Sequence, residues 1–80
     1  MSRTIAIRNL DFFIDEQLLT LIFCEFGLIL KIDLLRDDIS RTSRGEAFIE
    51  FKDLSAAEAS VQKMHDSVLN GRKIQVQQEL

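Results

Sequence analysis

Cysteine, proline and long apolar runs are scarce in this 80-residue chain. Cys24 is the single cysteine, which excludes an internal disulfide and suits a reducing intracellular compartment. Proline is absent, glycine occurs three times, and 46% of the residues are hydrophobic, so the composition is that of a compact fold and not of a disordered chain. The longest apolar run, residues 18–30, is interrupted by Glu25 and is too short to cross a membrane. We therefore expect one intracellular domain, nuclear or cytoplasmic, without a signal or membrane segment.

An excess of basic residues is also missing. The formal net charge of −3 argues against an unspecific binder of polyanions, although the face on which each charge lies matters more than the total. No set of nucleophile, base and acid is recognisable, so we expect a binding protein and not an enzyme. Cys24 and His65 are single potential ligands on separate predicted helices, so we expect neither a metal nor a cofactor.

Hydrophobic periodicity predicts the order strand, helix, strand, strand, helix, strand. Alternating apolar and polar residues predict strands over residues 4–9, 29–35, 44–51 and 73–77. Apolar residues at helical spacing predict helices over 15–26 and 53–65, with Asp15 and Asp53 as their N-caps. Gly27 is expected to end the first helix in the left-handed conformation, and residues 69–71 to form a turn before the last strand.

This order is best satisfied by an α+β fold, a ferredoxin-like βαββαβ sandwich. Because crossover connections are right-handed, both helices are expected on one face of a four-stranded antiparallel sheet, and the other face stays open. The core is predicted to contain Ile5, Ile7, Phe23, Phe26, Ile49, Phe51, Val61 and Ile74.

Two segments of the chain resemble the RNA recognition motif family. The family octapeptide has the form K/R-G-F/Y-G/A-F-V-x-F/Y, and residues 44–51 read RGEAFIEF. The family hexapeptide runs apolar, aromatic, apolar, any, Asn, Leu, and residues 5–10 read IAIRNL. The loop over 36–45 and the lead into the last strand over 69–72 fit the same pattern. The resemblance implies a single RNA-recognition-motif domain over residues 1–80 with single-stranded RNA as its partner.

In the family, aromatic rings on the open sheet face stack on unpaired bases. Three positions usually carry such rings, and here they hold Phe48, Ala6 and Glu46. The predicted RNA-binding residues are Phe48, Arg8, Arg44, Lys31, Arg41, Lys73, Gln75 and Glu46. Arg36 and Gln77 are expected on the same mildly basic face, above an acidic helical back. With two rings missing, we expect weak binding by one module of a larger RNA-processing or translation assembly.

A second hypothesis stays open, in which the fold serves protein interaction with little or no RNA binding. Leu18, Leu21 and Cys24 lie away from the core stripe of the first helix, as a docking patch for a protein partner or as scattered apolar surface. Glu46, in turn, is either an element of the RNA surface or a partner of Arg8 or Lys31 across neighbouring strands.

Overall fold

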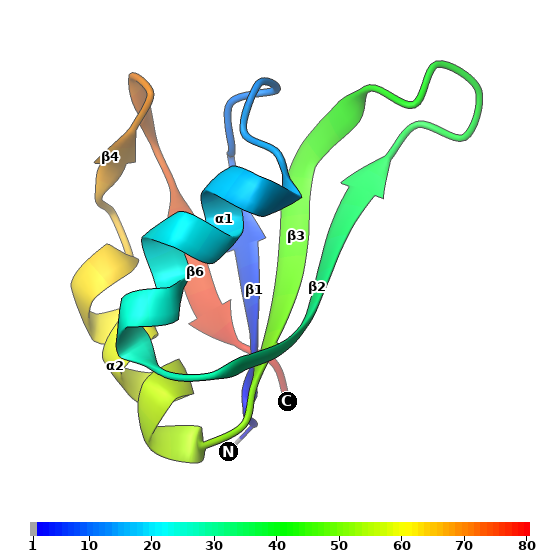
Figure 1. The fold of residues 1–80 in the computed structure, drawn as a ribbon. Helices are drawn as coiled ribbons and strands as arrows, with labels where there is room; N and C mark the ends of the chain where they lie inside the picture. The colour runs from blue at the N-terminus through cyan, green and yellow to red at the C-terminus, as the bar shows by residue number, and fades with distance from the viewer. Residues whose placement is uncertain (1) are drawn as a thin grey trace.

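The computed structural model describes residues 2–80, and Met1, the first residue of the expected domain, lies outside the described residues. The elements are β1 Thr4–Arg8, α1 Glu16–Phe23, the 3-10 turn η1 Cys24–Phe26, β2 Ile29–Arg36, β3 Ser43–Phe51, α2 Leu54–Met64, β4 Val68–Leu69, β5 Arg72–Lys73 and β6 Gln75–Gln78. One antiparallel sheet has the strand order β2-β3-β1-β6, and both helices cover the same face of it (Figure 1). The predicted α+β architecture is confirmed.

The core fills the space between the two helices and the inward face of the sheet. Phe23 and Phe51 are its largest completely buried side chains, and Ile5, Ile7, Ile49 and Ile74 are also completely buried. Phe26 and Val61 were expected in the core but are only partly buried against it. Between residues 2 and 80, no helix has the length and apolar character needed to span a membrane.

The first helix begins as the sequence predicts but ends differently. The Asp15 carboxylate accepts a hydrogen bond from the backbone N–H of Leu18 at 2.9 Å, which satisfies a free donor of the first turn. The α-helix stops at Phe23 and continues as η1. The left-handed conformation expected for Gly27 is wrong, because this residue is extended, with φ 160° and ψ −179°. Its close approach to Ala56 of α2 is what requires a glycine.

The second helix is one residue shorter at each end than predicted. Asp53 does occupy the N-cap position, but its side chain makes no capping hydrogen bond, so its expected role as a side-chain cap is wrong. The backbone carbonyl of Asp53 instead accepts a hydrogen bond from the N–H of Ala56 at 3.2 Å.

The predicted last strand is divided into two strands in the structure. Ile74 donates its N–H to Ser67 and accepts from Asp66 at 2.9 Å each, so the chain leaves the main sheet at this residue. As a result, β5 pairs with β4 in a small separate hairpin, and only β6 pairs with β1. The predicted turn over residues 69–71 is confirmed, with positive φ at Asn70 and Gly71, as the tight turns of hairpins require.

Candidate nucleic-acid interface

The face of the sheet that the helices leave uncovered presents side chains in rows that follow the strand register. The central row is Gln77 on β6, Ala6 on β1, Phe48 on β3 and Asp33 on β2. A neighbouring row contains Thr4, Glu50 and Lys31. Side chains in one row stand on the same side of the sheet because residues alternate between faces along each strand. Phe48 therefore stands between Ala6 and Asp33 on a face that no helix covers.

Phe48 forms part of a shallow hollow on this open face. The hollow has a volume of about 180 Å³ and is lined by Thr4, Lys31, Asp33, Phe48 and Glu50. The Phe48 side chain is half-buried, so one part of the ring packs on the sheet and the rest meets solvent. A flat aromatic surface beside open space is the arrangement that accepts a stacked base.

The other two positions of the usual aromatic platform lack rings, as the sequence shows. Ala6 is opposite Phe48 in the register and is only 4% exposed, so its neighbours cover it and it offers no contact surface. Glu46 is half-buried on β3, close to Phe48 on the same face. Among residues 2–80, no ion pair joins Glu46 to Arg8 or to Lys31, so the alternative in which Glu46 serves as a cross-strand partner is wrong.

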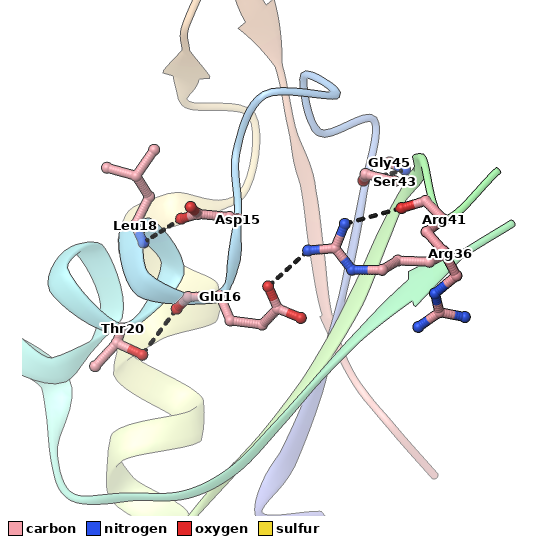
Figure 2. Close-up of polar contacts among 8 residues, drawn as sticks. All are labelled: Asp15, Glu16, Leu18, Thr20, Arg36, Arg41, Ser43 and Gly45. Carbon is pink, nitrogen blue, oxygen red and sulfur yellow. Dashed lines mark hydrogen bonds and ion pairs between the residues drawn. The ribbon is translucent and has the colours of Figure 1, made fainter.

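Arg36 is not part of the open face, contrary to expectation (Figure 2). Its Nη2 donates to Oε1 of Glu16 at 2.8 Å, and its Nη1 donates to the carbonyl oxygen of Arg41 at 3.0 Å. The bond from Arg36 lowers the pKa of the Glu16 carboxyl. Arg36 follows the buried Leu34 by two residues and stands on the same side of β2, so its guanidinium reaches toward α1. Arg36 therefore connects the edge strand β2 to the first helix, α1.

The remaining predicted basic residues are exposed but scattered. Arg8 is at the end of β1, Lys31 on β2, Arg44 near the start of β3, and Arg41 in the loop between β2 and β3. Lys73 lies on β5, outside the four-stranded sheet where it was expected. The outward strand positions carry as many acidic as basic residues. The basic ones are Arg8, Lys31 and Arg44, and the acidic ones are Asp33, Glu46 and Glu50. The expected mildly basic sheet face is therefore wrong, because the charge there is mixed.

Two glutamines extend the open face onto β6. Gln75 is opposite Arg8 and Gln77 is opposite Ala6. The Gln75 amide donates to the Asp66 carboxylate at 3.2 Å, which fixes its orientation, while Gln77 is exposed. Both side chains carry donors and acceptors of the kind that recognise base edges.

Two residues of the family motifs have structural roles here. Asn9 at the end of β1 donates to the carbonyl of Lys73 at 2.8 Å and also accepts from Arg72, which joins the small hairpin to the main sheet. Gly45 has φ +76°, and a Cβ atom at this position would lie 2.9 Å from the carbonyl oxygen of Leu10. The octapeptide glycine is thus required by the close contact between β3 and the end of the hexapeptide.

The predicted protein-partner patch is exposed but discontinuous. Leu18 borders a hollow of about 230 Å³, which is lined by Phe13, Ile14, Leu18, Ile22, Leu69 and Asn70. Leu21 and Cys24 are exposed on the same helical segment but do not line this hollow. In the part of the chain that the structure describes, no group of three or more His, Cys, Asp or Glu side chains is placed to hold a metal ion.

Sequence reasoning missed several residues of both surfaces. Asp33 and Glu50 line the hollow beside Phe48 but are not among the predicted site residues. The signal for both was available, since strand alternation places them on the face of Phe48. Phe12 and Phe13 are exposed in the loop before α1, where a pair of adjacent aromatic residues is conspicuous in the sequence.

Solved structures share this fold over nearly the whole chain. A structure of the RNA15 RRM superposes with a TM-score of 0.94, covering 98% of this chain and 90% of that chain at 22% identity. A structure of the Rna15 RRM with bound RNA (GU) gives a TM-score of 0.91 at 22% identity, covering 99% and 84%. The crystal structure of RNA Binding Protein PG1 gives a TM-score of 0.94 at 28% identity, covering 99% and 95%.

Curated relatives are considerably longer than this chain. Splicing factor 3B subunit 4 from Homo sapiens is 41% identical over 73 residues, which are 90% of this chain and 17% of that protein. The U11/U12 small nuclear ribonucleoprotein 31 kDa protein from Arabidopsis thaliana is 33% identical over 73 residues, 91% of this chain and 28% of that protein. The sequence model of the RNA recognition motif matches residues 5–75. The chain belongs to the RNA recognition motif family, whose members are RNA-binding modules.

Proposed function

We propose that this domain binds single-stranded RNA on the open face of its sheet, with Phe48 as the stacking ring. The observation that carries the proposal is the half-buried Phe48 ring beside a hollow on a face that neither helix covers. Arg8, Arg44 and Lys31 are exposed on the same face and supply donors for the RNA, with the two arginines on phosphates. Arg41 in the adjoining loop and Lys73 on β5 are peripheral contacts in this proposal, and Gln75 and Gln77 contact base edges.

The binding is weak in this proposal. Each stacked base contributes about 1–3 kcal/mol, and Ala6 and Glu46 provide no ring. The carboxylates on the same face repel the phosphate backbone, so the electrostatic attraction that supports most nucleic-acid binding is small. Such a module gains useful affinity by being linked to others in one assembly.

The surrounding protein is proposed to act in RNA processing inside the cell. This chain spans less than a third of the two curated relatives named above, whose names place one among splicing factors and the other in a small nuclear ribonucleoprotein. The family match does not favour the alternative in which the fold binds protein with little or no RNA.

Substitution of Phe48 tests the proposal directly. Phe48→Ala is expected to weaken binding of a fluorescein-labelled single-stranded oligonucleotide of mixed sequence by about tenfold, measured by fluorescence anisotropy. Phe13→Ala is the matched control, since Phe13 is exposed in the loop before α1 and does not line the hollow beside Phe48. Equal affinities of the Phe48 variant and the wild type would overturn the proposal.

The hollow beside Leu18 supports a second, additional role in protein binding. Its occupant in this proposal is a basic segment that presents an apolar side chain, because two carboxylates flank the hollow. Asp11 accepts from the Asn70 amide at 2.7 Å, and Asp15 accepts from the N–H of Leu18. Opposite charge at the rim and an apolar floor together favour such a segment.

A chemical-shift titration with a short peptide of alternating lysine and leucine tests this second role. Shifts at Leu18, Ile22 and Leu69 that disappear in Leu18→Asp are expected. Leu21→Asp serves as the control, because it adds the same charge to the same helix outside the hollow. Unchanged spectra of the wild-type domain would contradict the role.

A further inference from the structure

The hollow beside Phe48 contains charged side chains that the stacking of a base does not involve. Its lining includes the carboxylates of Asp33 and Glu50 and the ammonium group of Lys31. Although these groups share one face, no ion pair within 4.0 Å involves any of them in the described part of the chain. Their hydrogen-bonding capacity is therefore available to a ligand.

The register places one carboxylate directly next to the stacking ring. Asp33 on β2 is the cross-strand partner of Phe48 on β3, and Lys31 is two residues before Asp33 on the same face. Side chains of directly opposed residues stand about 4.5–5.5 Å apart at their Cβ atoms. A base stacked on Phe48 consequently has one edge within reach of Asp33, with Lys31 close to the same edge.

We infer that this hollow selects guanine, an inference that rests on the proposed binding of RNA at Phe48. An ionised carboxylate only accepts hydrogen bonds, and its two oxygens receive two parallel donors best. Guanine offers such a pair on its Watson–Crick edge, the ring N1–H and the 2-amino group, with the O6 acceptor beside them. In the inferred complex Asp33 accepts from both donors, and Lys31 donates to O6.

The other bases do not match this pair of groups. Adenine and cytosine place an unprotonated ring nitrogen beside their amino group, and that nitrogen would face a carboxylate oxygen without a proton between them. Uracil has one N–H between two carbonyl oxygens, so it supplies a single donor. A correct bidentate match distinguishes bases by about fivefold or more.

Labelled oligouridylates with one central substitution test the base preference by fluorescence anisotropy. The oligonucleotide with guanosine is expected to bind at least about fivefold tighter than those with adenosine or uridine. Inosine lacks the 2-amino group but keeps N1–H and O6, so the inosine oligonucleotide is expected to have intermediate affinity. Equal binding of the guanosine and uridine oligonucleotides would overturn the inference while leaving RNA binding intact.

The variant Asp33→Asn tests whether Asp33 produces the preference for guanosine. The amide keeps the shape of the carboxylate but replaces one acceptor with a donor, so the preference for guanosine is expected to fall to about twofold or less. Asp38→Asn removes the same charge from the exposed loop between β2 and β3 and is expected to keep the full preference. A preference that persists in Asp33→Asn would refute the assignment. If none of the oligonucleotides binds the wild type, the proposed function fails, and the inference with it.

Discussion

Gly27 lies so close to Ala56 of α2 that a Cβ atom on Gly27 would be 2.6 Å from the Cβ of Ala56. Real Cβ atoms essentially never approach so closely. Ala56 is buried on the inner side of α2, and Gly27 connects η1 to β2. Two small residues thus let the end of the first helical segment pass directly against the start of the second helix.

The first prediction follows from this contact. Gly27→Ala should lower the free energy of unfolding by about 1–3 kcal/mol, because one of two packed elements must move. Ala56→Gly alone should cost about 0.5–1 kcal/mol, since glycine is a poor helix residue. In the double variant the clash is absent, so it should be more stable than Gly27→Ala. Urea unfolding measures all four proteins, and purely additive effects would show that the contact has no energetic weight.

The second prediction concerns the bond between Arg36 and Glu16. The Arg36 guanidinium, and then the backbone N–H of Glu16 itself, hold the pKa of this carboxyl below its ordinary value of 4.5. Because the pKa is depressed in the folded state, the pair stabilises the fold above that ordinary value, and this stabilisation is lost as the pH falls through the lowered pKa.

Glu16→Gln should remove this part of the acid sensitivity. Both side chains are partly exposed, so solvent screens the pair and the loss at neutral pH should be about 0.5 kcal/mol. Urea midpoints recorded from neutral pH to about pH 3 should converge for the variant and the wild type at the acid end. Parallel curves over the whole range would contradict the role of the pair.

The fold was predictable because local patterns agree with one another. Alternation in β3 and helical spacing in α1 each determine which side chains face the core, and completely buried Phe51 and Phe23 confirm both. Errors arose where a contact distant in sequence decides local structure. The need for a glycine at position 27 comes from its contact with Ala56 in α2. The break in the last strand at Ile74 comes from hydrogen bonds to residues 66 and 67.

The site was predictable in part for the same reason. Alternation correctly placed Phe48, Glu46 and Arg8 on one face. Arg36 was expected on the open face, but the alternation that turns the buried Leu34 inward also turns Arg36 inward, and its partner Glu16 lies on a helix distant in sequence. Alternation also places Asp33 and Glu50 on this face, but the sheet order and the register are what put them around the hollow beside Phe48.

The third prediction tests phosphate contact by Arg44. This residue is exposed near the start of β3, and its removal should weaken RNA binding and reduce the salt slope of log K by about 0.7. Lys63→Ala is the matched control, because Lys63 lies on α2, where its Nζ is 3.5 Å from Glu25. Affinities measured across a series of salt concentrations give both slopes. If the two variants show the same slope as the wild type, Arg44 contacts no phosphate.

The last prediction concerns Glu46, which we hypothesise keeps the RNA affinity low. It is half-buried on the same face as Phe48, at a position where an aromatic ring would extend the stacking surface. Glu46→Phe removes a charge that repels phosphate and adds a surface worth about 1–3 kcal/mol per base, so single-stranded RNA should bind about tenfold tighter or more. Glu46→Gln removes the charge without adding a ring and should give only part of the gain. Anisotropy at one salt concentration compares both variants with the wild type. If neither variant binds more tightly, Glu46 does not limit affinity and the stacking surface does not extend along β3 beyond Phe48.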